Sequence, residues 1–159
     1  MTEPRRSLDR IDRALCAALA NNARLTNKEL AARVGLAPSS CLERVRRLVR
    51  DGVLRGFSAD VDPGALGFGL EAMMAVRLRQ HSRDQFDAFR AHALAIPEVV
   101  AVYHMAGEND FLIHVLARDA QHLRDLALDR FITRPEVGHI ETWLMFEHMR
   151  GQGALGGGA

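Results

Sequence analysis

The sequence has few features that could stabilise the protein in place of a hydrophobic core or anchor it in a membrane. Only two of its 159 residues are cysteine, Cys16 and Cys41, too few for a disulfide framework or a cysteine-based metal site. No uncharged stretch approaches the roughly 18 apolar residues that cross a bilayer. Residues 2–6 are polar and basic, so no signal peptide is predicted. These absences predict a cytoplasmic protein in a reducing compartment, without a membrane partner.

The sequence also lacks a net charge of either sign, since 21 Lys and Arg oppose 20 Asp and Glu to give +1. The charge is unevenly spread, however. Residues 1–60 hold twelve basic and seven acidic groups, a balance of +5, and residues 61–159 hold nine and thirteen, a balance of −4. Opposite signs predict two modules with different partners, the basic one a candidate for binding nucleic acid. Pro63 and three glycines within residues 62–69 predict a linker over 61–70.

Residues 1–60 carry the pattern of three helices. Apolar residues recur at three- and four-residue spacing from Leu8 to Leu19, which predicts an amphipathic helix. Thr26 and Glu29 form a capping box that starts a short second helix, and Gly35 ends it. A third helix follows, and residues 53–59 resemble a strand that would form a wing. This order predicts a winged helix-turn-helix, whose second element enters the major groove of DNA.

The third predicted helix carries an arginine-rich face with few neighbouring acids. Its first turn is where such helices meet base edges, and arginine grips guanine or phosphate with a planar fork. An alternative interpretation is that these arginines form an ordinary charged surface that contacts only water. Glu43 is expected to pair with Arg47 or, on the DNA side, to accept from a cytosine amino group. The residues predicted to contact DNA are Lys28, Ser39, Ser40, Arg44, Arg46, Arg47, Arg50 and Arg55.

Residues 71–148 contain an internal repeat. Pro-Glu-Val occurs at residues 97–99 and 135–137, each time after a helical pattern and before an apolar strand-like run. Another strand-like run precedes each helical pattern, at 72–79 and 111–117. Two successive β-α-β units predict a ferredoxin-like βαββαβ domain, with helices on one face of the sheet. The other face would expose a large apolar patch, which predicts homodimerisation through the sheet.

Several stretches together resemble the Lrp/AsnC family of transcriptional regulators, over residues 8 to about 150. They are Leu8-Asp9-Arg10-Ile11-Asp12, Arg24-Leu25-Thr26, Glu29-Leu30-Ala31, residues 34–48, Gly52-Val53-Leu54-Arg55-Gly56-Phe57 and the 62–67 hinge. A winged helix-turn-helix followed by a βαββαβ domain is an α+β fold class. It agrees with this family, whose second domain is a RAM-type domain that senses small molecules. The resemblance implies a bacterial or archaeal, nucleoid-associated regulator that binds double-stranded DNA as a dimer or octamer. Ala37 departs from the family by replacing a capping serine.

The resemblance also implies an amino-acid effector held between subunits by a loop at 107–110. Gly107 and Asp110 match the family pattern, whereas Asn109 replaces an aromatic residue and Glu108 keeps an acid. On the last strand the family often has two threonines where this chain has Ile140 and Thr142, which makes the expected site more apolar. The predicted effector-binding residues are therefore Gly107, Glu108, Asn109, Asp110, Ile140 and Thr142.

Two other functions remain open at the level of sequence. Some proteins of this architecture resemble haem-pathway decarboxylases, for which His104 and His114, possible neighbours across two strands, would be the residues to suspect. A chromosome-organising protein of low sequence preference is the other alternative. The seven histidines show no metal-ligand spacing, and no catalytic motif is found, so neither an enzyme nor a resident cofactor or metal is expected. Residues 149–159 are Gly-rich and are predicted to be a flexible tail.

Overall fold

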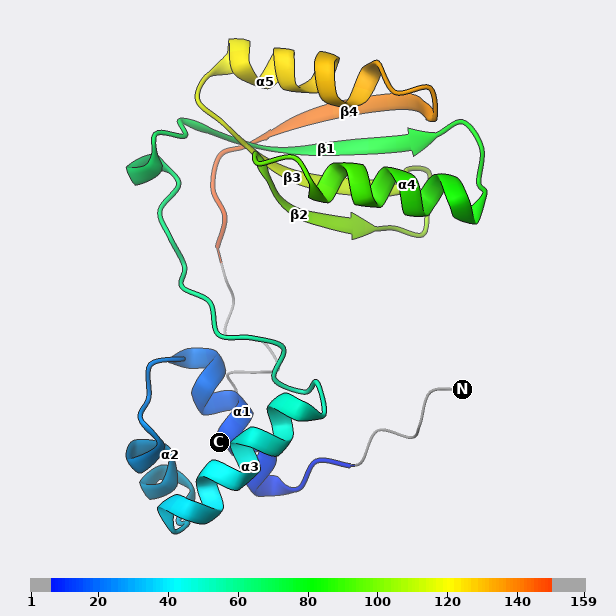
Figure 1. Cartoon of the computed structure of the whole chain (residues 1–159). Helices are drawn as coiled ribbons and strands as arrows, with labels where there is room; N and C mark the ends of the chain where they lie inside the picture. Colours follow the sequence, from blue (N-terminus) through cyan, green and yellow to red (C-terminus); the bar gives the residue numbers. More distant parts are fainter. Residues whose placement is uncertain (1–6, 150–159) are drawn as a thin grey trace. The chain divides into compact units, whose positions relative to one another are not determined.

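The computed structural model describes residues 7–149, so most of the expected tail at 149–159 lies outside the described residues. The chain divides into two compact units, one ending at Asp60 and the other spanning Val61–His148 (Figure 1). Within the described residues no helix has the length and apolar character needed to traverse a bilayer.

The first unit consists of three helices, α1 (Arg10–Asn21), α2 (Asn27–Val34) and α3 (Pro38–Arg50). Their buried core is small and includes Leu15, Leu30, Cys41 and Leu48. The predicted capping box starts α2, with both of its hydrogen bonds present. Gly35 ends α2 in the left-handed region at φ 68°, which a residue with a side chain rarely adopts. The expected helix-turn-helix is therefore confirmed in its helices and its turn.

The strand expected over residues 53–59 is not formed. Turns and bends occupy residues 51–54, and residues 55–62 have no regular secondary structure. The backbone amides of Val53 and Leu54 both donate to the carbonyl oxygen of Leu48 at 2.9 and 3.0 Å. These bonds bind the start of the segment to the end of α3, and a β-ladder needs a partner strand that this unit does not provide.

The second unit is a four-stranded antiparallel sheet with the strand order β2-β3-β1-β4. Its elements follow the predicted βαββαβ order, and a π-helical segment, Ala127–Ile132, extends α5. The ferredoxin-like prediction is confirmed, including the strands that start directly after the two Pro-Glu pairs. The elements are β1 (Leu70–Leu78), α4 (Arg83–Leu94), β2 (Val99–His104), β3 (Phe111–Ala117), α5 (Ala120–Leu126) and β4 (Val137–Met145).

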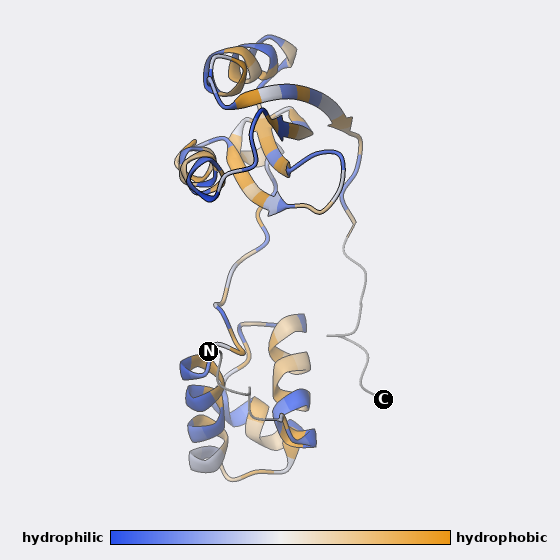
Figure 2. Ribbon diagram, turned by 90° about the vertical axis from the view of Figure 1, so that its right-hand side faces the viewer, coloured by the Kyte–Doolittle hydropathy of each residue, from blue (hydrophilic) through white to orange (hydrophobic). Residues whose placement is uncertain are grey.

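The two faces of this sheet have different surroundings (Figure 2). Alternate residues of β1 and β3, such as Met74, Val76 and Ile113, are fully buried beneath α4 and α5. The opposite face carries Met73, paired with Trp143 across β1 and β4, and no helix of the unit covers it. Leu78 is also buried, on the same side as Met74 and Val76, as strand alternation requires.

Candidate nucleic-acid interface and effector site

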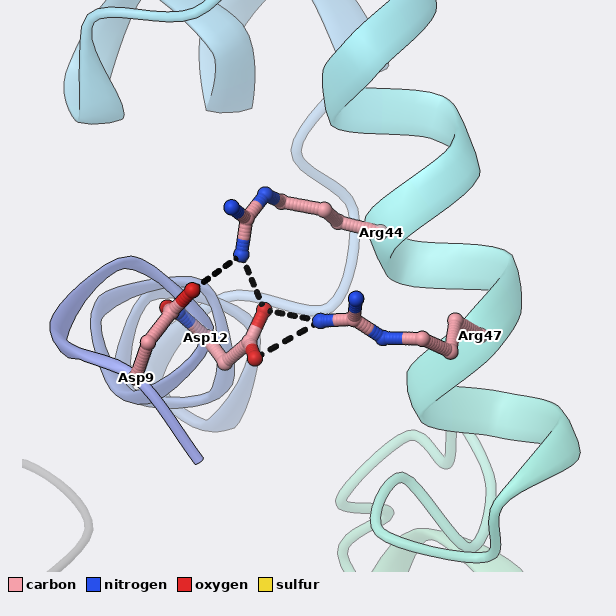
Figure 3. A network of polar contacts seen from close by, with 4 residues as sticks. All are labelled: Asp9, Asp12, Arg44 and Arg47. Atoms are coloured by element: carbon pink, nitrogen blue, oxygen red, sulfur yellow. Dashed lines mark hydrogen bonds and ion pairs between the residues drawn. The ribbon is translucent and has the colours of Figure 1, made fainter. Parts of the chain in front are cut away.

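Arg44 and Arg47 lie on the side of α3 that faces α1. Nη1 of Arg44 lies 2.6 Å from Oδ2 of Asp9 and 2.8 Å from Oδ1 of Asp12. Nη2 of Arg47 donates to both carboxylate oxygens of Asp12, at 2.8 and 2.7 Å (Figure 3). The side chain of Asp12 is only 5% exposed. The expectation that the arginine face lacks balancing acids is therefore wrong for these two residues, since α1 supplies both acids.

The network also shifts the pKa values of Asp9 and Arg44. Asp9 is the N-cap of α1, and its Oδ1 accepts a 2.7 Å hydrogen bond from the amide of Asp12. That backbone hydrogen bond, followed by the one from Arg44, holds the pKa of Asp9 below its ordinary value of 3.8. The bonds to Asp9 and Asp12 raise the pKa of Arg44. Asp9 thus joins the start of α1 to the middle of α3 as a carboxylate.

A second stripe on α3 points away from α1. Ser39, Glu43, Arg46 and Arg50 follow one another at spacings of four, three and four, and all are exposed. The carboxylate of Glu43 lies 3.6 Å from Arg46, not beside Arg47 as expected, because Arg47 is already bound to Asp12. Both members of this pair are largely solvated, so little holds them together. This stripe is available for contact with an outside partner.

The remaining residues predicted to contact DNA are also exposed. Ser40 lies in the first turn of α3, Lys28 in α2, and Arg55 in the irregular segment after α3. Ala37, at the N-cap of α3, makes no side-chain cap, so the first amides of this helix lack the hydroxyl acceptor that Thr26 provides for α2.

The predicted effector loop is the connection between β2 and β3. Met105 donates to the carbonyl of Asp110 at 2.8 Å, which closes the hairpin. The buried carboxylate of Asp110 accepts from the backbone amide of Leu78 at 2.7 Å and lies 3.1 Å from His81. Glu108 is exposed, 3.4 Å from Arg77. Asp110 thus connects β1 to β3, a structural role that sequence reasoning did not assign to it.

Ile140 and Thr142 lie on β4, away from this hairpin within one chain. Ile140 is paired with Val76 on one side of β1, and Phe111, next to Asp110, is paired with Val76 on the other side. Two strand spacings of about 4.8 Å therefore separate the two groups. A site that includes both the hairpin and Thr142 needs either a ligand that bridges β1 or a second chain.

The two histidines suspected of catalysis lie on opposite faces of the sheet. His104 packs against Phe111 and Phe86, with ring centroids 5.1 and 4.9 Å apart, on the side of α4. His114 lies on the open face, and its Nε2 is 2.8 Å from Oε2 of Glu71. The expectation that they are neighbours across the strands is wrong, because His114 pairs with Ala101 and not with His104. Among the described residues no group of three or more metal-ligating side chains is assembled.

Comparison with known proteins agrees with both units. The description "Lrp/AsnC ligand binding domain" matches residues 71–154, and "winged helix-turn-helix DNA-binding" matches residues 8–55. The chain belongs to the Lrp/AsnC family. It is a transcriptional regulator with a helix-turn-helix of the DNA-binding type and a small-molecule-binding domain. The expected resemblance and the α+β fold class are confirmed.

Individual relatives support the same assignment over nearly the whole chain. The HTH-type transcriptional regulator AldR of Mycolicibacterium smegmatis is 45% identical over 94% of this chain and 88% of its own length. The leucine-responsive regulatory protein of Salmonella typhimurium is 33% identical over 92% and 90%. A solved transcriptional regulator of Neisseria meningitidis, in complex with L-Met, has a TM-score of 0.83 at 30% identity, covering 91% of this chain and 94% of its own.

Sequence reasoning missed Asp9 and Asp12 as the partners of the arginines on α3. The signal was present, since Asp12 follows Asp9, the cap of the same helix, by three residues, and Arg47 follows Arg44 by three on another helix. Such spacing places each pair on a single helix face. Matching the two pairs would have predicted the ion pairs between α1 and α3.

Proposed function

We propose that the chain is an amino-acid-responsive, sequence-specific regulator that contacts its operator through the exposed stripe of α3. The observation that carries this proposal is the division of the arginines on α3. Arg44 and Arg47 are bound to α1, while Arg46 and Arg50, with side chains 65% and 72% exposed, have only solvated carboxylates, Glu43 and Asp51, at 3.6 Å and remain available to DNA. Ser39, Ser40, Arg46 and Arg50 would contact bases and phosphates, with Lys28 and Arg55 on the flanking backbone.

This proposal reassigns two residues that the sequence analysis placed at the DNA. Arg44 and Arg47 would act as positioning residues, since their bonds to Asp9 and Asp12 set the angle between α1 and α3. Glu43 would lie at the DNA surface beside Arg46. An acid in a groove repels phosphate but accepts from the amino group of cytosine, so Glu43 favours cytosine at the base it faces.

We propose further that residues 1–60 bind DNA, that 61–70 act as a hinge, and that 71–148 sense the effector and assemble. A second copy would cover the open face of the sheet. Tyr103 and Trp143 on that face are 50% and 48% exposed, beside Met73 and Leu112. Such an apolar surface is typical of an interface between subunits. Two helix-turn-helix units would then meet half-sites about one helical turn apart. Octamers would form from these dimers.

The effector would be a free amino acid held between sensor domains, with Gly107, Glu108, Asn109 and Asp110 of one chain near Ile140 and Thr142 of another. The solved relative in complex with L-Met supports this class of ligand. We further propose that the protein works in the cytoplasm on the nucleoid, without catalysis and without a resident cofactor. The separation of His104 and His114 favours this over the decarboxylase alternative.

Selection of binding sites from fragmented genomic DNA tests the DNA part. The full chain should enrich a small set of sequences with two-fold symmetry, and its affinity for them should fall steeply with added salt. Equal retention of all fragments would instead indicate a chromosome-organising protein.

Operator affinity measured with each of the twenty amino acids tests the sensing part. At least one should change the affinity, and by linkage operator DNA should change the affinity for that amino acid by the same factor. No change with any of them would contradict the sensing part. A Soret band on addition of a haem precursor would favour the enzyme.

A further inference from the structure

The open face of the sheet carries a polar pair among its apolar residues. Nε2 of His114 on β3 donates to Oε2 of Glu71 on β1 at 2.8 Å. Their side chains are 13% and 29% exposed, although no described helix of the unit covers this face. Met73 is the direct neighbour of His114 on β1, and Trp143 is paired with Met73 on β4. Because β1 and β3 are the two central strands, the pair lies within the surface proposed to meet a second copy, and not at its edge.

The hydrogen bond to Glu71 decides which ring nitrogen of His114 can take up a proton. A carboxylate accepts, so Nε2 of the neutral ring carries the hydrogen and Nδ1 carries none. Among residues 7–149 no group forms a hydrogen bond with Nδ1. Addition of a proton to Nδ1 therefore makes the ring positive without breaking the bond to Glu71. Imidazole is the side chain that makes this change between about pH 5 and 8.

The other charged and titratable groups on or beside the open face are exposed. The nearest is His148, whose ring centroid lies 6.3 Å from that of His114. His139 and Glu141 form a second histidine–glutamate pair at 3.2 Å, but their side chains are 46% and 45% exposed. The full set is Arg77 on β1, Tyr103 on β2, Glu108 in the hairpin, His139 and Glu141 on β4, and Glu147 and His148 after β4.

The charge of this face depends on its imidazoles. Within the strands and the hairpin, the carboxylates of Glu71, Glu108 and Glu141 oppose the single guanidinium of Arg77, so a face with neutral imidazoles is negative. Two copies of such a face repel each other when they meet. Protonated histidines balance the carboxylates, and two balanced faces meet without an excess of either sign.

Burial by a second copy makes the charge of His114 more important than that of His139. A carboxylate that loses its remaining water beside a neutral partner is costly, whereas an imidazolium makes the same hydrogen bond a charge-assisted one. Glu71 is the more buried of the two glutamates that pair with histidine, so this cost falls mainly on its bond with His114. The more exposed pair on β4 keeps more of its water, and its charge contributes less.

We propose that dimerisation through the open face takes up protons at His114, so that the dimer becomes weaker as the pH rises from 6 to 8. A two-fold dimer contains two such pairs, so up to two protons are taken up per dimer. Because two half-sites require two helix-turn-helix units, operator binding at low protein concentration follows the same trend. The inference rests on the proposed function in assigning the open face to a second copy.

The test is the dimer dissociation constant of the full chain, labelled at its N-terminus and measured by fluorescence-detected sedimentation at pH 6, 7 and 8 and constant ionic strength. The constant should rise at least about tenfold from pH 6 to pH 8. His114→Gln keeps an N–H donor for Glu71 but cannot take up the proton, so its constant should change less than about threefold.

Glu71→Gln gives a readout that a merely structural pair would not produce. Without the carboxylate, a protonated His114 is an unpaired charge in the interface, so this dimer should become weaker as the pH falls, the reverse of the parent. His139→Gln and His148→Gln are the matched controls, and both should keep the pH dependence of the parent. Circular dichroism of each variant at each pH checks that its fold is retained.

The proposal is overturned if the parent dimer has the same dissociation constant across this pH range, and the proposed assembly then stands. It is also overturned if the pH dependence survives in His114→Gln and disappears in either control. Trp143→Lys should weaken the dimer at least about tenfold, and unchanged dimerisation in this variant would mean that another surface is used. In that case, or if the parent is monomeric at every pH, both the inference and the proposed assembly fail.

Discussion

The two sides of α3 carry the same residue type for different purposes. Arg44 and Arg47, 27% and 30% exposed, are bound to two acids of α1, whereas the side chains of Arg46 and Arg50 are 65% and 72% exposed. A one-residue step along a helix turns a side chain by about 100°, enough to exchange one environment for the other. The difference teaches that an arginine count on a helix does not measure its capacity to bind DNA.

The largest effect is expected from Arg47→Ala, which removes the guanidinium nitrogen that donates to both carboxylate oxygens of the buried Asp12. Removing one member of a fully buried pair costs about 3–5 kcal/mol. Because Arg47 is 30% exposed and Arg44 still contacts Asp12, we expect the free energy of unfolding to fall by about 2–3 kcal/mol. Urea denaturation measures this, with Arg46→Ala as the control that should stay within about 0.5 kcal/mol of the parent. An equal decrease in the free energy of unfolding for the two variants would contradict the proposed difference between the two sides of α3.

For operator affinity the order of the two variants is reversed, and Arg46→Ala should have the larger effect. Arg46→Ala should lower operator affinity by about 1–3 kcal/mol and relax the preferred sequence at one position if Arg46 contacts a base. If it contacts phosphate only, all sequences should be weakened alike and the salt slope should fall by about one. Fluorescence anisotropy over a salt series distinguishes these results. Unchanged operator affinity in Arg46→Ala would contradict the proposal that the exposed stripe of α3 contacts DNA.

A smaller increase in stability is expected from a substitution at the N-cap of α3, which lies on neither of the two arginine faces. Ala37 has the extended N-cap backbone, at φ −64° and ψ 145°, but offers no acceptor. Ala37→Ser should raise the free energy of unfolding by about 0.5–2 kcal/mol, the usual contribution of a capping hydroxyl. Thermal melting checks this, and Ala37→Val, which cannot cap, should give no gain.

The smallest effect concerns acid pH and again involves only the side of α3 that faces α1. Because the pKa of Asp9 is lowered, its stabilising contribution is complete above the ordinary value of 3.8 and is lost as the pH falls through the folded-state pKa. Asp9→Asn should therefore lose less stability than the parent when the pH is lowered below about 4. Denaturation curves at a series of acid pH values test this, and an identical pH dependence for both proteins would count against the tie between Asp9 and Arg44.

The fold was predictable to a large extent because its signals are local. Thr26 with Glu29, Gly35, and the repeated Pro-Glu-Val segments mark helix starts, helix ends and strand starts through nearest-neighbour hydrogen bonds and backbone preferences. The strand over 53–59 was wrong for the opposite reason. A strand exists only when another segment pairs with it, and a run of apolar residues does not reveal whether such a partner is present.

The candidate sites were predictable as segments but not as arrangements. The sequence located the hairpin at 107–110, yet not that Asp110 would accept from Leu78 across the sheet. It marked His104 and His114 as neighbours, whereas strand register turns them to opposite faces.

The sequence by itself determined that this chain has a basic helical module and an acidic βαββαβ module, since charge balance and periodicity are properties of the chain. The tertiary structure alone decided which arginines of α3 are held by α1 and which remain exposed to an outside partner. The physical reason is that Asp9 and Asp12 satisfy the nearest guanidinium groups, and only the packing of α1 against α3 makes Arg44 and Arg47 the nearest.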